Sequence, residues 1–160
     1  MITDVSIRLA RLADAAQIAE MARDYIEHGL PWTWTAERVA RAILDPDTNV
    51  VVVGERGAVT AFGIMFHASD DAHLLLFAVR HEKQRRGTGT AILHWLEEAA
   101  RVAGAKRVRV ECRTDNAPAR NFYCEHGYTE IDITNKMYRG LKDGIHLEKW
   151  FRPDGDVPSE

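Results

Sequence analysis

Residues 74–90 have the sequence LLLFAVRHEKQRRGTGT, and this stretch decides the fold. The apolar run 74–79 predicts a buried strand, the segment 80–86 predicts a basic loop, and a helical pattern starts near Gly89. A helix N-terminus offers N–H groups without intrahelical partners and about half a positive charge. Further charge comes from three side chains of the loop, Lys83, Arg85 and Arg86. The stretch therefore predicts a diphosphate site, although a helix end beside solvated charges is the alternative from these residues alone.

Hydrophobic spacing elsewhere in the chain predicts strands and helices in mixed order. Strands are expected at 5–9, 50–53, 59–66, 74–79, 107–113, 128–133 and 144–150, and helices at 14–25, 35–45, 89–103 and 116–122. We expect Asp14 to cap the first helix and Asn116 or Asp115 to cap the last. Because helices occur before, within and after the strands, the pattern indicates an α/β or α+β sheet with helices on both faces.

Composition limits the class of protein. A chain of 160 residues with 46% hydrophobic and 28% charged residues can bury a sizeable core. A net charge of −3 argues against a general nucleic-acid binder, and the longest apolar run, 74–79, is too short to span a membrane. Two cysteines without metal-ligand spacing and a plain N-terminus predict a reduced, cytoplasmic setting. We expect one domain over 1–152, a loose tail over 153–160, and no metal, nucleic-acid or membrane partner.

Two segments resemble signatures of the GNAT N-acetyltransferase superfamily. Residues 79–89 are similar to its acetyl-CoA loop, Gln/Arg-x-x-Gly-x-Gly/Ala after a strand that ends in valine, although His81 stands where the family often has proline. Residues 116–128 are similar to its second signature, Asn-x-x-Ala-x-x-Leu/Phe-Tyr-x-x-x-Gly-Phe/Tyr. The resemblance covers residues 4–134. It implies a mixed, largely antiparallel sheet of six to seven strands, with helices on both faces and a splayed central strand pair.

The resemblance also implies acetyl-CoA as cosubstrate and assigns residues to it. The backbone of three strand residues is expected to pair with the pantetheine arm, namely Phe77, Ala78 and Val79. The N–H groups of six loop and helix residues are expected to hold the pyrophosphate: Arg85, Arg86, Gly87, Thr88, Gly89 and Thr90. Asn116 is expected to hydrogen-bond the cofactor, and the Val79 N–H is the expected oxyanion donor.

Tyr123 matches the tyrosine of the second signature, which the family places to protonate the sulfur of coenzyme A. The alternative is a core aromatic on a short helix, a part that its neighbour Phe122 is expected to play. Adjacent helical side chains point about 100° apart, so one of the two can be buried while the other reaches a cleft. We therefore predict Tyr123 as the general acid.

Glu111 is the predicted general base. It lies on the charged side of the expected strand 107–113, and a strand covered on both faces would be apolar on both. Its surroundings are similar to the Leu-Glu-Val-Arg-x-Ser-Asn stretch of bacterial ribosomal-protein-alanine N-acetyltransferases, whose glutamate serves as base. The alternative is a carboxylate paired with Arg109 or Arg113 on a solvated face. His73 and Asp71 are second choices for the base.

The predicted function is N-acetyl transfer from acetyl-CoA to a primary amine, by direct transfer in a ternary complex. The acceptor is a protein N-terminus or a small-molecule amine, and the protein is expected to be a monomer or a homodimer. The aromatic segment 29–34, with Trp32 and Trp34, is a candidate wall of the acceptor site, core packing being the alternative. A non-catalytic acyl-CoA-binding or sensor domain is the alternative function.

Overall fold

The computed structural model describes residues 6–84, 87–138 and 142–152. Its strands are β1 (Ile7–Leu9), β2 (Thr48–Glu55), β3 (Ala58–Ala68), β4 (Asp71–Val79), β5 (Arg107–Arg113), β6 (Thr129–Tyr138) and β7 (Lys142–Trp150). Its α-helices are α1 (Ala15–Met21), α2 (Ala36–Leu44), α3 (Thr88–Val102) and α4 (Ala117–Glu125). Its short 3₁₀ helices are η1 (Leu12–Asp14) and η3 (His81–Lys83), and η2 (Ala22–Ile26) is a π-helical continuation of α1. Each strand and helix predicted from the hydrophobic spacing is present, so the expected α/β class is confirmed.

The strands form one seven-stranded sheet in the order β1-β2-β3-β4-β5-β7-β6. The pairs β1–β2, β2–β3, β5–β7 and β6–β7 are antiparallel, whereas β4 and β5 are parallel. The parallel pairing covers four residues, from Asp71 opposite Arg107 to Leu74 opposite Val110. The mixed, largely antiparallel sheet of the prediction is confirmed with seven strands, and the splay of its central pair stays a prediction.

The chain divides into two compact units. The first unit comprises residues 1–66 and 75–99, and the second comprises residues 67–74 and 100–160. Strand β4 contributes its first four residues to the second unit and its last five to the first. The expectation of a single domain over 1–152 stays a prediction, and the tail 153–160 lies outside the described residues.

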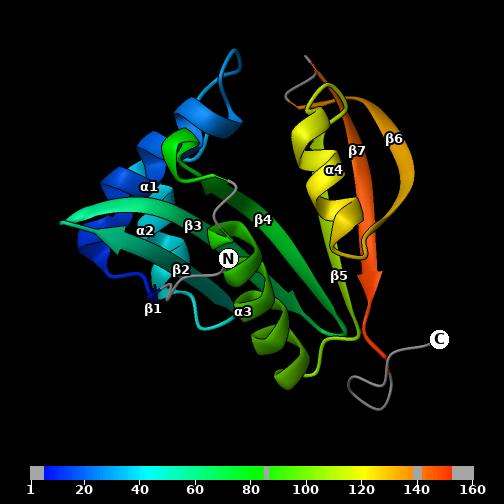
Figure 1. The fold of residues 1–160 in the computed structure, drawn as a ribbon, viewed down its shortest axis with the longest axis horizontal. Helices are drawn as coiled ribbons and strands as arrows, with labels where there is room; N and C mark the ends of the chain where they lie inside the picture. The colour runs from blue at the N-terminus through cyan, green and yellow to red at the C-terminus, as the bar shows by residue number, and fades with distance from the viewer. Residues whose placement is uncertain (1–5, 85–86, 139–141, 153–160) are drawn as a thin grey trace. The chain divides into compact units, whose positions relative to one another are not determined.

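The first unit carries helices on both faces of its strands (Figure 1). One face packs against α1 and α2 in a core that includes Ile18, Val39 and Phe62. On the other face α3 approaches β3 so closely that a Cβ at Gly63 would lie 2.7 Å from Leu96 Cδ1. Because successive side chains of a strand point to opposite faces, Phe62 faces α1 and α2 while Gly63 faces α3. The predicted two-sided covering of the sheet is confirmed in this unit.

In the second unit, one face of β5 is buried and the other is polar. Val108, Val110 and Cys112 are buried, whereas the side chains that alternate with them are charged. Burial raises the pKa of the Cys112 thiol to about 11, because the thiolate would lose its hydration. Since the charged side chains alternate with buried ones, they all belong to the opposite face of the strand, as the sequence pattern predicts.

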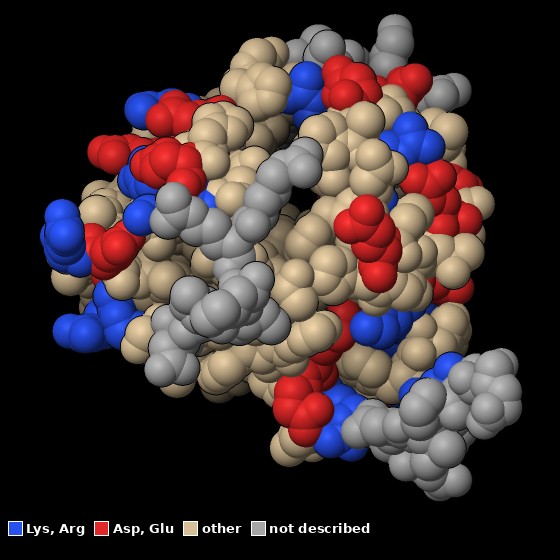
Figure 2. All heavy atoms as spheres, in the orientation of Figure 1, with Lys and Arg blue, Asp and Glu red and all other residues tan. Residues whose placement is uncertain are grey.

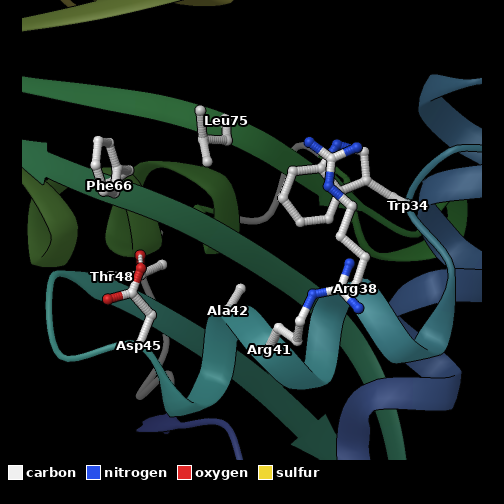
Figure 3. Close-up of a pocket in the computed structure, with 8 residues that line it drawn as sticks. All are labelled: Trp34, Arg38, Arg41, Ala42, Asp45, Thr48, Phe66 and Leu75. Atoms are coloured by element: carbon white, nitrogen blue, oxygen red, sulfur yellow. Dashed lines mark hydrogen bonds between the residues drawn. The ribbon is translucent and has the colours of Figure 1, made fainter.

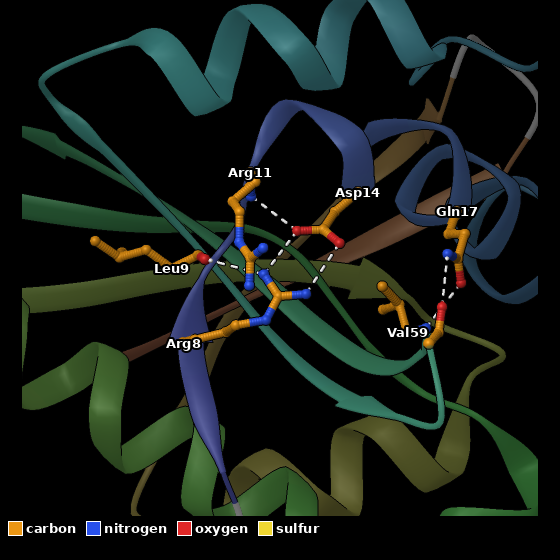
Figure 4. Close-up of polar contacts among 7 residues, drawn as sticks. Arg8, Leu9, Arg11, Asp14, Gln17 and Val59 are labelled. Carbon is orange, nitrogen blue, oxygen red and sulfur yellow. Dashed lines mark hydrogen bonds and ion pairs between the residues drawn. The ribbon is translucent and has the colours of Figure 1, made fainter.

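Asp14 does not cap α1 with its carboxylate, so that part of the prediction is wrong. Instead the carboxylate accepts a hydrogen bond from the Arg11 N–H at 2.8 Å and two from the Arg8 guanidinium at 2.8 and 3.0 Å (Figure 4). The short turn η1 inserts before α1 and directs the side chain back towards β1. The Arg8 guanidinium holds the pKa of the Asp14 carboxyl below its usual range. Asp14 thus joins the first strand to the first helix.

We expect Asp14→Asn to lower the free energy of unfolding by about 1–2 kcal/mol, since hydrogen bonds to a charged group are lost and Arg8 is partly screened by solvent. A lowered folded-state pKa stabilises the fold above the pH at which an unfolded aspartate titrates, about 3.9, and this contribution disappears as pH falls through the folded-state value. Urea unfolding of wild type and variant at pH 7 and below pH 4 measures this contribution to the free energy of unfolding. The gap between wild type and variant should narrow in acid, while Asp24→Asn, which removes a fully exposed pair with Arg23, should change nothing measurable.

The surface of the described residues carries both signs of charge. On the face that Figure 2 shows, Lys and Arg side chains lie among Asp and Glu side chains. Of the helices described, none has the length and apolar character needed to cross a bilayer.

Candidate active site

The basic loop after β4 is anchored to the strands of the first unit. The Arg80 backbone N–H donates to the Thr60 carbonyl at 2.9 Å, and its side-chain Nε donates to the Val59 carbonyl at 2.8 Å. Lys83 Nζ lies 2.6 Å from Glu55 Oε1, at the far end of β2. The positive charge of Lys83 is therefore paired with a carboxylate of the same unit, and its contribution to ligand binding stays a prediction.

His81 replaces the proline of the family pattern and holds the loop in another way. Its backbone N–H donates to the Tyr25 hydroxyl at 3.2 Å, and the two rings lie 4.8 Å apart at their centroids. The Gln84 amide Nε2 donates to the Val79 carbonyl at 2.8 Å, which turns the chain back onto the end of β4. These contacts position the segment that leads into α3.

The N-terminus of α3 has the geometry of an anion site. Gly87 has a φ of +84°, a conformation that side chains with a Cβ rarely adopt. The Ala91 N–H donates to the Gly87 carbonyl at 3.0 Å, and the residues between them form the first helical turn, whose N–H groups precede the ladder of the helix. Gly87, Thr88, Gly89 and Thr90 are all half-buried. This arrangement suits the predicted diphosphate, and Arg85 and Arg86 lie outside the described residues.

The predicted cofactor strand is the last part of β4. Ala78 is buried in the core shared with α1 and α2, whereas Phe77 is half-buried and lies near Gly63, which faces α3. The Val79 carbonyl already accepts the bond from Gln84, so one of its two lone pairs is used within the loop. Leu75 is 43% exposed, so the expectation that the whole run 74–79 is buried is wrong.

Glu111 projects from the polar face of β5 in the second unit, and its side chain is 53% exposed. The antiparallel pairing of β5 with β7 sets it directly opposite His146. Glu111 Oε2 lies 3.3 Å from His146 Nδ1, so the two side chains form a carboxylate–imidazole pair on one face of the sheet. A carboxylate beside an imidazole provides two groups that can accept a proton in turn.

Glu111 pairs with neither Arg109 nor Arg113, the two alternative partners predicted for it. Arg113 pairs with Asp115 at 3.3 Å, and among the described residues Arg109 has no carboxylate within ion-pair distance. Asp71, a second choice for the base, receives two hydrogen bonds from Arg107. The guanidinium lowers the pKa of the Asp71 carboxyl, which makes it a weak proton acceptor. His73 is half-buried in β4 opposite Arg109, and its role as base stays a prediction.

Helix α4 carries the remaining predicted residues. Asn116 is its N-cap, and its side-chain oxygen accepts a bond from the Ala119 N–H at 3.2 Å, as predicted for a capping residue. One lone pair of that oxygen is used by the cap, and the Asn116 backbone N–H already donates to the Arg113 carbonyl at 3.0 Å, so its predicted bond to the cofactor falls to the rest of the side-chain amide. Tyr123 is 5% exposed and packs edge-on against both Phe122 and Tyr128, whereas Phe122 is half-buried, so the expectation that Phe122 is the core aromatic of the two is wrong. The Tyr128 N–H donates to the Tyr123 carbonyl at 3.0 Å, which ends the helix beside the tyrosine ring.

The predicted residues fall into two groups. Those at 77–79 and 87–90 belong to the first unit, whereas Glu111, Asn116 and Tyr123 belong to the second. In the parts of the chain that are described, no three His, Cys, Asp or Glu side chains are placed to hold a metal ion.

His146 is the residue that the sequence analysis missed. The histidine lies far from Glu111 along the chain and has no spacing that marks a metal or catalytic motif. The antiparallel register of β5 with β7 is what places His146 opposite Glu111, and a single sequence does not specify that register.

The two tryptophans of segment 29–34 have different surroundings. Trp34 is buried, and the Arg38 guanidinium lies 3.8 Å from the centroid of its ring. Trp32 is 42% exposed, with the Arg23 guanidinium 5.3 Å from its ring centroid. Trp34 therefore fits the core-packing alternative, although it also lines a hollow beside α2, and Trp32 is the exposed one of the two.

Comparison with known proteins gives a consistent result. The family model described as "Acetyltransferase (GNAT) family" matches residues 15–128. An N-alpha-acetyltransferase of Sulfurisphaera tokodaii is 27% identical over 146 residues, which cover 86% of this chain and 87% of that protein. The [ribosomal protein bS18]-alanine N-acetyltransferase of Escherichia coli is 32% identical over 94 residues, which cover 57% of this chain and 64% of the relative.

Solved structures share the fold. A crystal structure of the ribosomal-protein-S18-alanine N-acetyltransferase from Escherichia coli has a TM-score of 0.77 and 23% identity, and covers 98% of this chain and 97% of that chain. The PaiA N-acetyltransferase of Thermoplasma acidophilum, solved in complex with coenzyme A, has a TM-score of 0.78 and 17% identity. That match covers 93% of this chain and all of the other, 100%.

Proposed function

The chain belongs to the acetyltransferase (GNAT) family and is an N-acetyltransferase, and from this premise we propose that it acetylates the α-amino group at the N-terminus of a polypeptide. The proposed donor is acetyl-CoA, and the proposed route is direct transfer in a ternary complex. Relatives named for N-terminal and for ribosomal-protein-alanine acetylation support this acceptor over a small-molecule amine.

The observation that carries the proposal is the pair of Glu111 and His146. An α-amine titrates near pH 8, so much of it arrives protonated at neutral pH and must lose that proton before its lone pair attacks. Glu111 is the proposed acceptor of the proton, since its carboxylate is exposed on the polar face of β5. The imidazole of His146, 3.3 Å away, is the proposed second group that can take up the proton.

The remaining roles follow from the residues around α3 and α4. Bound acetyl-CoA would supply the acetyl thioester, held by the backbone of 77–79 and the N–H groups of 85–90, with Asn116 as a further contact. The structure of PaiA with coenzyme A supports this ligand class. Tyr123 is the proposed proton donor to the leaving sulfur, because its phenol carries an O–H donor on a ring that Phe122 and Tyr128 hold in place.

The test is release of free thiol from acetyl-CoA with a panel of acceptors. The panel contains peptides with a free α-amine, the same peptides with the α-amine blocked, and small amines such as polyamines and free amino acids. We expect turnover of the free peptides and none of the blocked ones. Turnover of small amines alone would contradict the polypeptide acceptor. Tight binding of coenzyme A without turnover of any amine would instead favour a non-catalytic acyl-CoA sensor.

A further inference from the structure

A hollow of about 240 Å³ lies in the first unit, beside α2. Its apolar lining comes from Trp34, Phe66 and Leu75, and two arginines of α2, Arg38 and Arg41, border it (Figure 3). None of the residues predicted to bind the cofactor or to act as acid or base lines this hollow.

The aromatic side of the hollow is held in place by a half-buried network of hydrogen bonds. The Glu27 carboxylate accepts a bond from the Trp34 N–H at 3.0 Å and further bonds from the backbone N–H and the hydroxyl of Thr33. Trp34 is thereby fixed, and the Arg38 guanidinium stacks on its ring at 3.8 Å from the centroid. A planar guanidinium that stacks on an indole keeps its N–H groups directed sideways for hydrogen bonding.

The charge of the hollow is positive on balance, because Arg38 and Arg41 line it together with one carboxylate, that of Asp45. Among the described residues, neither Arg38 nor Arg41 has a carboxylate within ion-pair distance, although both side chains are exposed on the same side of α2. The Asp45 carboxylate keeps its negative charge and is held by two neutral donors, the Asp47 N–H at 2.9 Å and the Thr48 hydroxyl at 3.0 Å. Two arginines above an apolar floor are complementary to an anionic group on an apolar stem.

The hollow lies next to the strand that we propose for the cofactor. Leu75 precedes Phe77 by two residues on β4, which is about 7 Å along a strand. An extended polypeptide advances about 3.5 Å per residue, so an acceptor whose α-amine is at the thioester brings one of its first few side chains to this distance.

We propose that Arg38 and Arg41 bind an acidic side chain within the first four residues of the acceptor polypeptide. This specificity rests on the proposed function. A carboxylate is chosen over a phosphate because a polypeptide carries carboxylates without prior modification. The methylene stem of the acidic residue packs on Leu75 and Phe66, and its carboxylate meets the two guanidinium groups.

The test uses the full chain, acetyl-CoA and peptides with Glu or Gln at position 2, 3 or 4. At one of these positions, we expect the Glu peptide to have a kcat/KM about 10-fold or more above that of its Gln counterpart. Arg38→Gln and Arg41→Gln should each reduce this preference to about 3-fold or less, while leaving kcat/KM for the Gln peptide unchanged. Equal efficiency with Glu and Gln at all three positions overturns the proposal.

Arg56→Gln is the matched control, because Arg56 is an exposed arginine in the turn after β2. Thr48 and Glu55 mark opposite ends of β2, so this turn is about 23 Å along the strand from the hollow. The control should keep the full preference for Glu. Loss of the preference in all three variants would indicate a general effect of net charge and contradict a specific site.

A measurement of peptide binding distinguishes failure of this proposal from failure of the proposed function. If no peptide is acetylated, the proposed function fails, and calorimetric titration with the same Glu and Gln peptides still tests the hollow. Tighter binding of the Glu peptide, lost in Arg38→Gln, supports the site, and equal binding overturns it. Competition by millimolar inorganic phosphate, but not by acetate, would assign the arginines to a phosphate group and overturn the carboxylate assignment.

Discussion

Tyr123→Phe is expected to lower kcat by roughly 10²-fold or more, the usual contribution of a general acid, while binding of coenzyme A stays nearly unchanged. The substitution removes one hydroxyl and keeps the ring, so the edge-on packing against Phe122 and Tyr128 should persist. Steady-state kinetics and calorimetry with coenzyme A measure the two effects separately. A variant with wild-type kcat would remove Tyr123 from the mechanism.

Tyr128→Phe is the matched control for that experiment. Tyr128 is also buried, lies in the same aromatic cluster and would lose the same single hydroxyl. Because it is assigned no chemical role, its kcat should stay within a few-fold of wild type. An equal loss in both variants would indicate that the cluster, and not the Tyr123 phenol, is what the reaction requires.

Glu111→Gln is expected to lower kcat by about 10²-fold and to flatten the acidic limb of the pH–rate profile. The limb arises because protonation removes the base, and an amide in its place has no proton to gain. Glu148→Gln is the control, since Glu148 follows His146 by two residues on β7 and bonds Arg107 at 3.0 Å. It loses the same charge from the same strand pair and should retain the limb.

A substitution of His146 tests whether its imidazole takes part in the proton transfer from the amine. If the imidazole passes on the proton that Glu111 accepts, His146→Asn should lower kcat less than Glu111→Gln, and the double variant should be no worse than Glu111→Gln alone. An acidic limb that persists in Glu111→Gln and disappears in His146→Asn would make the imidazole the base. Additive losses would show that the two side chains act independently.

Local signals in the sequence were sufficient to predict the order of the elements. Alternation along 107–113 identified β5 and its polar face, and the N-cap Asn116 marked the start of α4. These features succeed because a strand period of two and a capping hydrogen bond involve residues that are close along the chain. Element boundaries moved by a few residues, as in β7, which begins at Lys142 and was predicted to begin at 144.

Long-range pairing was the part that local signals missed. Lys83 was predicted to add positive charge for a diphosphate, and the partner that local signals missed is Glu55, which lies 2.6 Å away at the end of β2. Asp14 was expected to bond its own helix, yet β1 presents Arg8 to it. In each case the residue that forms the ion pair lies on another element, and its proximity depends on how the strands and turns are arranged.

The sequence by itself determined the class of the sheet, the glycine-bearing loop before α3 and the identities of Glu111 and Tyr123 as candidates, because these depend on short-range periodicity and on motif spacing. Only the tertiary structure decided that His146 faces Glu111 and that Arg38 and Arg41 border an apolar hollow without an acidic partner among the described residues. The physical reason is register: a shift of one residue in strand pairing moves each side chain to the opposite face, and that choice is made by the packing of the whole sheet.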